Sequence, residues 1–584
     1  MRGPVVRVGW VSVAALTLLV LSPPRAGAES SRARVAGAAV AVVTDSNELF
    51  LEAPPLANEG WIRFTRRFCA SDQARSEVEA YNGKATRLLR DGRYKVPFGL
   101  LHAKYQLAVM QALFVDDLVG SSGWRHYVRG AEGRTNESLW SISQWFTGSG
   151  ENFSELRRLN ALDDEFLAEG QEVLISPTLL RPSLAAALPS PTSASSEAGL
   201  EYGRDEGGQF AVYRLRAGEA LYSSVVVRLT GRIHADDVNE LVEGIAERSG
   251  ISDVRTIPVG YRVKIPVDVL APEFLPPAHP RRLEYEEGRS ETARYTNRAR
   301  SRDLAGVTVI LDPGHGGRDV GASISGVWES VYVYDIALRV RRVLQDRSAA
   351  KVVLTTKDGA EFRVQEKDVL GTSRGHKVLT RPPYAISDSK VSSNLRWYLA
   401  NSVLARAVEA DRRADKVVFV SIHADSLHPS LRGAMVYVPG LLKNPSNYGK
   451  TGVVYSSRQE VKERPRVTFS RQQRVESEGL SRDLAGHLID TFRENGLTIH
   501  ANKPVRDRVI RANRAWVPAV LRFNAVPSKV LLEVCNLANA EDRRLIRTSS
   551  FREKVAAGVA DAIISYYGVR QHHSEPPQVA NLRK

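Results

Sequence analysis

The chain has 584 residues, which is too long for one ordinary domain and predicts roughly three or four folding units. Lysine and arginine outnumber aspartate and glutamate by 81 to 66, so the formal net charge is +15 and acidic polymers are the favoured partners. The only two cysteines, Cys69 and Cys535, exclude a disulfide scaffold and a zinc knuckle, and we expect two unpaired, buried thiols.

Residues 1–28 have the three-part layout of a secretory signal peptide. Arg2 and Arg7 precede an apolar run over residues 8–21, and the small residues 26–28 form a cleavage site. The apolar run is shorter than the roughly 20 residues that a membrane-spanning helix needs. We therefore expect export to the periplasm or cell wall, no transmembrane segment in the mature chain, and no nucleic acid as a partner.

Three segments of the N-terminal half end on a similar phrase, in which a glycine precedes a short strand-like run, a proline and then leucine. The phrases are GRYKVPFGLL from Gly92, GQEVLISPTLL from Gly170 and GYRVKIPVDVL from Gly260. An aromatic residue near a helix start precedes each phrase, and amphipathic stretches such as SELRRLNAL lie between. The pattern predicts a repeated unit of strand, helix, helix and strand.

This unit resembles the LysM module, a small carbohydrate-binding domain of cell-wall enzymes. The resemblance predicts a degenerate copy at residues 59–102 and clearer LysM-like copies at 126–180 and 211–270. Residues 181–208, rich in proline, serine and alanine, and the proline-rich, charged residues 271–303 are predicted linkers. In the second copy a longer GAEGRTNESL replaces the compact opening of the family, so degenerate spacers that bind no sugar are the alternative.

A different pattern begins at residue 304 and continues to residue 569, before a polar tail at 570–584. Apolar strand candidates alternate there with helical stretches. The strands are predicted at 307–311, 352–355, 417–422, 435–438 and 530–534, and the helices at 332–344, 395–409, 480–495 and 552–567. This alternation predicts a layered α/β domain with a mostly parallel sheet, preceded by the small α+β modules.

Three polar side chains fall at or near the ends of predicted strands, where ligands bind in such sheets. His315 lies between glycines in VILDPGHGGRDVGA, and His423 follows an apolar run in KVVFVSIHAD. Glu533 lies inside the apolar run KVLLEVCNLAN, where a buried carboxylate is costly unless it is paired or used. A lone strand-end histidine is more often structural, but no Walker, dinucleotide or HExxH motif accounts for the glycines, which suit close approach to an imidazole-bound ion.

Four motifs occur in the order seen in the zinc-dependent N-acetylmuramoyl-L-alanine amidases, and together they resemble that catalytic domain over about residues 304–569. The motifs are ILDPGHGGRDVGA, WESVYVYDIALRV, VFVSIHADS and SKVLLEVCNLAN. The resemblance implies that His315, Glu329 and His423 bind Zn²⁺ and that Glu533 is the catalytic glutamate. Taken alone, Glu329 is equally well a first-turn acid favoured by the helix dipole.

The resemblance also implies a reaction. Two histidines and one glutamate leave a fourth zinc position open for water, whose pKa the metal lowers toward about 7. Glu533 then takes the proton of this water and passes it to the leaving amine, while zinc stabilises the oxyanion. The expected substrate is peptidoglycan, cut between N-acetylmuramic acid and the L-alanine of the stem peptide. The alternatives are a non-catalytic wall-binding or regulatory protein with this fold, and a zinc peptidase that cuts within the stem peptide.

Two stretches are longer than the family usually needs. Residues 358–393 are expected to form a surface loop, and a gate over the zinc is a hypothesis that predicts higher activity on their deletion. Residues 441–471 are basic and are either a solvated face or a contact for acidic wall polymers. Arg396 and Asn401 resemble a family pattern and are expected to brace the site. A protein activator is a further partner that the family resemblance allows.

Overall fold

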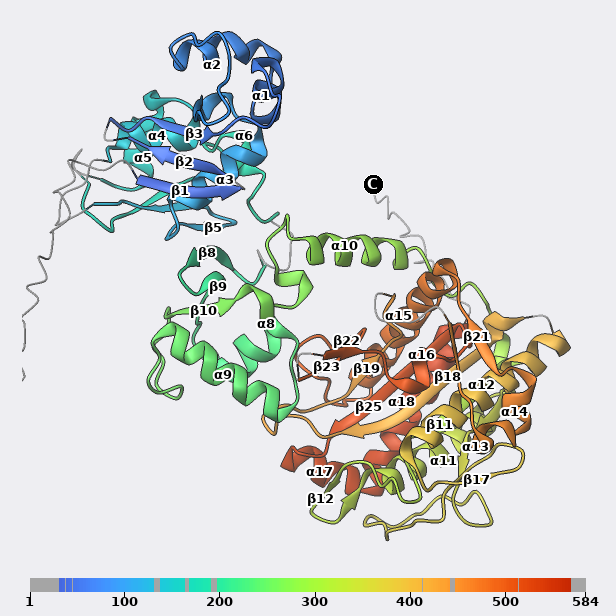
Figure 1. The fold of residues 1–584 in the computed structure, drawn as a ribbon. Coiled ribbons are helices and arrows are strands. Elements are labelled where there is room, and N and C mark those ends of the chain that lie inside the picture. Colours follow the sequence, from blue (N-terminus) through green and yellow to red (C-terminus); the bar gives the residue numbers. More distant parts are fainter. Residues whose placement is uncertain are drawn as a thin grey trace, which may run out of the picture. The chain divides into compact units, whose positions relative to one another are not determined.

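The computed structural model describes residues 31–568, apart from residues 37, 45, 131–136, 163–166, 191–196, 412, 442–446 and 513. The predicted signal peptide and the polar tail lie outside the described residues. The chain forms two compact units, one ending at Leu188 and one beginning at Pro189 (Figure 1). In the part of the chain that the structure describes, no helix is long and apolar enough to cross a membrane.

The N-terminal unit contains two copies of a strand, two helices and a strand. In the first copy β3 pairs antiparallel with β4, and α1 and α2 lie between them in the chain. In the second copy β6 pairs antiparallel with β7 around α4 and α5. The strands are β1 (Ser31–Ala36), β2 (Ala39–Val43), β3 (Leu49–Ala53), β4 (Tyr94–Pro97), β5 (Leu118–Gly120), β6 (Gly123–Tyr127) and β7 (Glu172–Ile175). The helices are α1 (Trp61–Phe68), α2 (Arg75–Tyr81), α3 (Ala103–Leu113), α4 (Leu139–Thr147), α5 (Phe153–Leu159) and α6 (Pro182–Ala185).

These elements match the predicted order within each repeat, but not the predicted boundary of the first copy. Strand β3, which pairs with β4, lies before residue 59, because the aromatic residue that marks the copy in the sequence begins α1 and not the first strand. In the second copy, local sequence signals account for both ends of α4. Ser138 caps α4 by accepting a hydrogen bond from the backbone N–H of Ser141 at 3.1 Å, and Gly148 ends the helix in the left-handed region with a φ of 95°.

The third copy belongs to the C-terminal unit. Its strands β9 and β10 pair antiparallel, and two helical segments lie between them in the chain. The elements are β8 (Glu201–Asp205), β9 (Gly208–Arg214), a π-helical turn (Leu221–Val227), α8 (Arg228–Thr230), α9 (Ala235–Ser249) and β10 (Arg262–Pro266). Strand β8, which pairs with β9, lies within the predicted linker 181–208, so part of this stretch belongs to a sheet.

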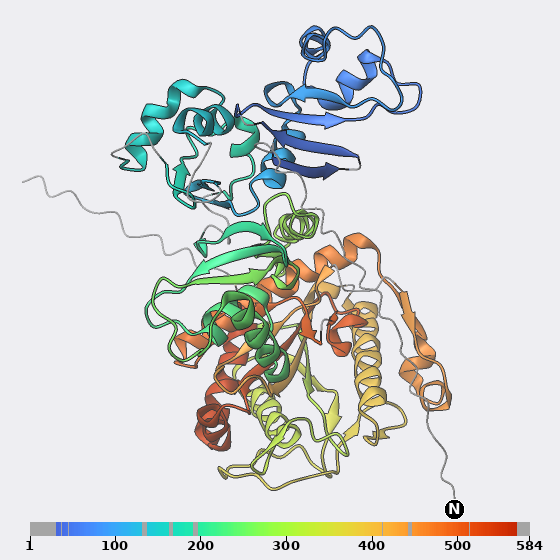
Figure 2. The same cartoon turned by 60° about the vertical axis from the view of Figure 1, so that its left-hand side comes forward.

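The third copy packs directly on the C-terminal domain, and its apolar core is continuous with that of the domain (Figure 2). The backbone N–H of His428 donates to the carbonyl of Ile233 at 2.8 Å, and the side chain of Tyr222 stacks on the His428 ring with centroids 5.2 Å apart. The guanidinium of Arg506 donates to the carbonyl of Gly231 at 3.1 Å. The third copy is therefore built into the same unit as the candidate site.

The predicted charged linker 271–303 contains a helix, α10 (Pro280–Thr292), that begins with proline at its first position. Two ion pairs involve this helix: Arg282 contacts Glu286 at 2.7 Å within it, and Glu291 contacts Arg471 at 2.6 Å. Pairing along a helix and across to a neighbour explains why a highly charged segment is ordered here.

The C-terminal domain has a six-stranded sheet in the order β14-β11-β18-β25-β19-β22. The first four strands are parallel, β19 is antiparallel to β25, and β22 is parallel to β19. The domain's strands are β11 (Thr308–Pro313), β12 (Ser323–Ile324), β13 (Val327–Trp328), β14 (Lys351–Leu354), β15 (Thr356–Lys357), β16 (Lys377–Val378), β17 (Tyr384–Ala385), β18 (Val417–Asp425), β19 (Met435–Tyr437), β20 (Asn447–Gly449), β21 (Arg466–Thr468), β22 (Val505–Arg506), β23 (Val509–Arg511), β24 (Arg514–Trp516) and β25 (Ser528–Asn536).

Helices cover both faces of this sheet (Figure 1). They are α11 (Glu329–Arg347), α12 (Ser389–Asp411), α13 (Val453–Ser456), α14 (Gln459–Glu463), α15 (Arg471–Glu494), α16 (Ala519–Arg522), α17 (Ala540–Arg547) and α18 (Ser549–Tyr567). Along β11, Val309 and Leu311 join one apolar core with α11, α15 and α18, whereas Ile310 joins the core on the other side with α12. Burial on both faces explains the unbroken apolar strands of the sequence and confirms the predicted mostly parallel α/β domain.

The two cysteines, Cys69 and Cys535, are unpaired and buried, as predicted.

A buried charged cluster in the second copy generates a stability prediction. The His126 ring is fully buried, and its Nδ1 and Nε2 lie 3.0 Å from Asp117 and 2.8 Å from Glu137. Burial alone would lower the pKa of His126, but the two carboxylates raise it to about 9. In the unfolded chain the pKa of His126 is near 6.5. The charged His126 ring therefore stabilises the fold fully below pH 6.5, and this contribution is lost as the pH rises through about 9.

We expect His126→Gln to remove up to about 3 kcal/mol of stability at pH 6 and much less at pH 10. The measurement is thermal unfolding of the full chain at both pH values, monitored by near-ultraviolet circular dichroism. His102→Gln, at a partly exposed histidine, is the control. An equal loss of melting temperature at both pH values would contradict a charged His126.

Candidate metal centre

The loop after β11 is shaped by close approach of other chain segments. A Cβ on Gly314 would lie 2.5 Å from the ring of His423, and one on Gly317 would lie 2.2 Å from the carbonyl oxygen of Ile386. His315 itself has a φ of 60°, in the left-handed region that residues other than glycine seldom adopt. Gly314 and Gly317, on either side of His315, are therefore required by two neighbouring segments that touch the loop.

The structure brings the three predicted metal ligands together at the carboxyl end of the parallel strands. His315 follows β11, Glu329 begins α11, and His423 lies near the end of β18. One donor atom from each lies within 4.8 Å of the other two. The Oε1 atom of Glu329 is 3.3 Å from Nε2 of His315 and 3.0 Å from Nδ1 of His423.

The Glu329 carboxylate is fixed from several sides. The backbone N–H groups of Ala322 and Ala424 donate to its two oxygens at 2.8 and 3.1 Å. Burial would raise the pKa of Glu329, but the rings of His315 and His423 hold it well below its usual range. Glu329 is therefore an ionised, oriented carboxylate rather than a solvated acid in a first helical turn.

A further carboxylate orients the first histidine. Oδ1 of Asp319 lies 2.9 Å from Nδ1 of His315, which leaves Nε2 to face Glu329. Burial lowers the pKa of His315, and Glu329 and Asp319 together raise it to about 10. Asp319 is a site residue beyond the four predicted ones, and its spacing of four residues from His315 in the loop is the signal for it in the sequence. Metal-binding histidines commonly carry such an outer carboxylate.

Glu533 lies beside the three ligands on β25, where it is the register partner of His423 on β18. Its side chain is 7% exposed, and Oε2 has no hydrogen-bond partner among the described residues. Burial raises the pKa of Glu533 well above its ordinary value, and the carboxylates of Asp425 and Glu329 raise it further. Glu533 is thus a carboxyl group poised to hold a proton at the edge of the cluster.

Arg396 contacts the site, whereas Asn401 does not. The Arg396 guanidinium donates to the carbonyl of His315, and its Nε lies 3.8 Å from the buried carboxylate of Asp312. Asn401 instead bonds the carbonyl of Phe523 at 3.1 Å, at the segment that precedes β25. Arg396 therefore holds the histidine loop, and Asn401 joins α12 to the segment before β25.

The donor set fits a zinc ion. Two imidazole nitrogens and one carboxylate oxygen are the protein ligands of many catalytic zinc sites, in which a fourth position is open to water or substrate. The Asp319 contact supplies the outer partner that orients one of these imidazoles. His315, Glu329 and His423 could therefore hold Zn²⁺, with Glu533 next to it.

Comparison with known proteins finds similarity over the C-terminal domain. Residues 309–565 match the family model described as N-acetylmuramoyl-L-alanine amidase. The chain is 27% identical to the N-acetylmuramoyl-L-alanine amidase AmiA of Escherichia coli over 267 residues, which cover 44% of this chain and 75% of that protein. It is 28% identical to AmiC of Neisseria meningitidis over 264 residues, 44% of this chain and 52% of that protein.

Among solved structures, the amidase Ami1 from Mycobacterium smegmatis aligns with 46% of this chain and 99% of its own, with 19% identity and a TM-score of 0.29. The amidase CwlV catalytic domain of Bacillus (Paenibacillus) polymyxa aligns with 44% of this chain and 97% of its own, with 23% identity and a TM-score of 0.24.

The loop geometry predicts that Gly314→Ala lowers zinc content. Since the added Cβ would lie 2.5 Å from the His423 ring, the ring or the loop must shift, which disturbs the alignment of His423 with Glu329. We expect zinc per chain, measured by mass spectrometry after dialysis, to fall about tenfold or more. Gly486→Ala is the matched control, because this α15 glycine has open space around its Cβ position and alanine favours a helix by about 1 kcal/mol. Full zinc content in Gly314→Ala would contradict the packing argument.

Proposed function

We propose that the C-terminal domain hydrolyses the amide bond between N-acetylmuramic acid and the L-alanine of peptidoglycan stem peptides. The observation that carries the proposal is the cluster of His315, Glu329 and His423 beside Glu533, in a domain that matches the amidase family model. All four reactive side chains meet at one end of the sheet, which favours an enzyme over a binding protein that merely keeps the fold.

Zn²⁺ held by the three ligands would polarise the scissile carbonyl and lower the pKa of a water molecule toward about 7. The protein contributes the proton transfers. Glu533 accepts the proton of the attacking water at Oε2, the buried oxygen that has no partner among the described residues, and returns it to the amide nitrogen as the bond breaks. A divalent cation at the neighbouring ligands favours the ionised form of Glu533 that this first step needs.

The rest of the chain supports delivery to a cell wall. We propose that residues 1–28 direct export and that the three strand–helix–helix–strand units are LysM-like modules that bind glycan. The excess of basic residues over acidic ones favours attraction to acidic wall polymers, including at the basic stretch 441–471, of which residues 442–446 lie outside the described residues. A protein activator fits the same setting.

The inserted segment 358–393 supports the site rather than gating it. A Cβ on Gly316 would lie 2.7 Å from the Cβ of His376, and the N–H of Arg318 donates to the carbonyl of Ile386 at 2.9 Å. The fully buried Arg552 donates to the carbonyl of Lys367 at 2.6 Å. These contacts hold the first half of the segment, at Lys367, and the second half, at His376 and Ile386, against the domain. They argue against a freely moving gate.

Glu533→Gln tests the proposed reaction. Purified peptidoglycan digested by zinc-loaded protein should release stem peptides with a free L-alanine amino terminus, identified by mass. Loss of the general base should reduce their release by about 10²–10⁴-fold, while bound zinc stays unchanged. Glu494→Gln, at an exposed position near the end of α15, is the control. Products cut within the stem peptide would indicate a peptidase, and no product from folded, zinc-loaded protein would indicate a binding protein.

Replacing residues 359–374 by a short Gly-Ser linker tests the role of the segment while His376 and Ile386 are kept. Because Arg552 loses its carbonyl partner, we expect a melting temperature lower by several degrees and no gain in peptidoglycan turnover. Glu366→Ala is the control, since it leaves the segment in place and removes only the ion pairs of an exposed carboxylate with Arg342 at 2.9 Å and Arg339 at 3.8 Å. Higher turnover in the linker variant would instead establish a gate.

A further inference from the structure

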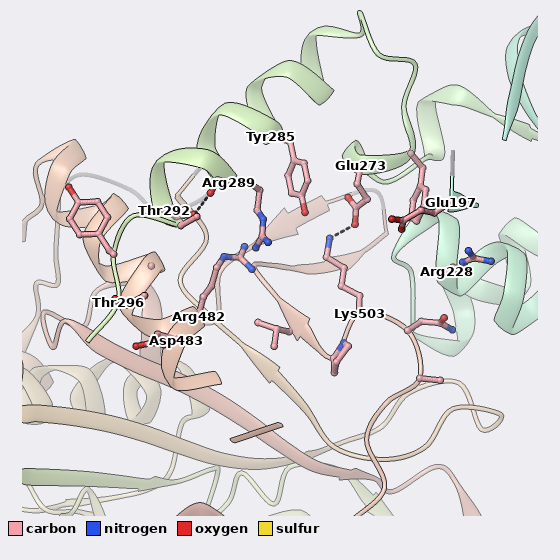
Figure 3. A pocket seen from close by; sticks show the side chains of 18 residues that line it. Glu197, Arg228, Glu273, Tyr285, Arg289, Thr292, Thr296, Arg482, Asp483 and Lys503 are labelled. Atoms are coloured by element: carbon pink, nitrogen blue, oxygen red, sulfur yellow. Dashed lines mark hydrogen bonds and ion pairs between the residues drawn. The ribbon is translucent and has the colours of Figure 1, made fainter. Parts of the chain in front are cut away.

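A pocket of about 770 Å³ lies between the third repeat, α10 and the segment that precedes β22 (Figure 3). All of its lining residues belong to the C-terminal unit, and none of them is a predicted metal ligand. The third repeat contributes Arg228 to the wall, and α10 contributes Tyr285 and Arg289. The pocket is therefore a second concave site in the same unit, with its own set of polar groups.

Two arginine side chains, Arg289 and Arg482, face the pocket, and they differ in their ion pairs. Arg482 is bonded to Glu478 at 2.6 Å and lies 3.8 Å from Asp507. The side chain of Arg289 has no ion pair or hydrogen bond within the described part of the chain, and Figure 3 shows both guanidinium groups directed into the same space. Two like charges directed at a shared space repel each other unless an anion lies between them. Guanidinium groups bind carboxylates and phosphates through paired N–H donors.

An acceptor lies across the pocket from these donors. Oε1 of Glu273 accepts from Nζ of Lys503 at 2.5 Å, whereas its Oε2 is buried and has no hydrogen-bond partner among the described residues. A buried carboxylate oxygen without a donor is costly, so a ligand that brings an N–H or O–H group would be stabilised there. The pocket thus offers positive groups on one side and an unused acceptor on the other.

We propose that this pocket binds a ligand that carries an anionic group beside a hydrogen-bond donor, and that the ligand is the released stem peptide. That peptide has carboxylates for Arg289 and Arg482, and the amine freed at L-alanine is a donor for Glu273. The choice of ligand rests on the proposed function, whereas the anion-binding character of the pocket does not.

The pocket is connected through the sheet to β25, the strand that carries Glu533. Lys503, which contacts Glu273, lies two residues before β22. Strand β22 pairs with β19, and β19 pairs with β25 so that Met435 is the register partner of Glu533. A product bound in the pocket would therefore contact a segment only two strands away from the strand that carries the proposed base.

The test is calorimetric titration of the full zinc-loaded chain carrying Glu533→Gln with a synthetic stem peptide. We expect one binding event to weaken by at least about tenfold when Arg289→Ala is added, since a charge-assisted hydrogen bond is lost. Arg294→Ala is the control, because this exposed arginine lies shortly after α10 and does not line the pocket. Unchanged binding in the Arg289→Ala protein overturns the proposal.

Two further ligands distinguish the sources of the anionic group. An N-acetylated stem peptide, which lacks the free amine, should bind more weakly than the free peptide, and Glu273→Gln should remove this difference. A different result would overturn the peptide assignment in favour of a phosphate-bearing wall polymer. In that case inorganic phosphate binds, the stem peptide does not bind, and Arg289→Ala weakens the binding of phosphate. Arg289-dependent peptide binding in a protein that lacks amidase activity would refute the proposed function and keep the pocket.

Discussion

The buried carboxylate of Glu329 is the interaction on which the candidate site depends. It lies 3.3 Å from one histidine ring and 3.0 Å from the other, so it joins the loop after β11, the start of α11 and the end of β18. Two backbone N–H groups hold it in place, and the absence of side chains at Gly314 and Gly321 makes room for the rings and for the carboxylate itself. Without this carboxylate the two imidazoles would face each other with no negative group between them.

The sheet explains why these groups can meet. Parallel strands β11, β18 and β25 end at the same edge, so side chains from distant parts of the sequence converge there. Helices cover both faces of the sheet and exclude water from it, which strengthens electrostatic contacts at the edge and raises the pKa of Glu533. The same burial that stabilises the strands therefore prepares a carboxyl group to carry a proton.

Local patterns in the sequence were sufficient for much of this arrangement. The apolar runs and periodic helices of residues 304–569 predicted the strands β11, β14, β18, β19 and β25 and the four long helices that cover them, because double burial leaves an unbroken apolar signature. The motifs named the four residues that the structure brings together. The motifs did not reveal the partners of those residues. Asp319 reaches the His315 ring only because the loop turns between them. His376 and Ile386, which pack against the glycines after His315, lie in the segment 358–393, whose polar, proline-interrupted sequence is typical of a loop.

Charge and proline content alone did not indicate the helix between the third repeat and the sheet. Residues 271–303 are rich in charge, yet they contain α10, in which Arg282 pairs with Glu286 and Glu291 pairs with Arg471. The third repeat joins the C-terminal unit through a shared apolar core and through Arg506, which donates to the carbonyl of Gly231, and just after the repeat Glu273 pairs with Lys503. Composition cannot distinguish a solvated charge from one with a partner hundreds of residues away, since the distinction is made only when the chain folds. A repeat that is fixed in this way presents its surface at a constant position relative to the sheet and to the candidate metal centre.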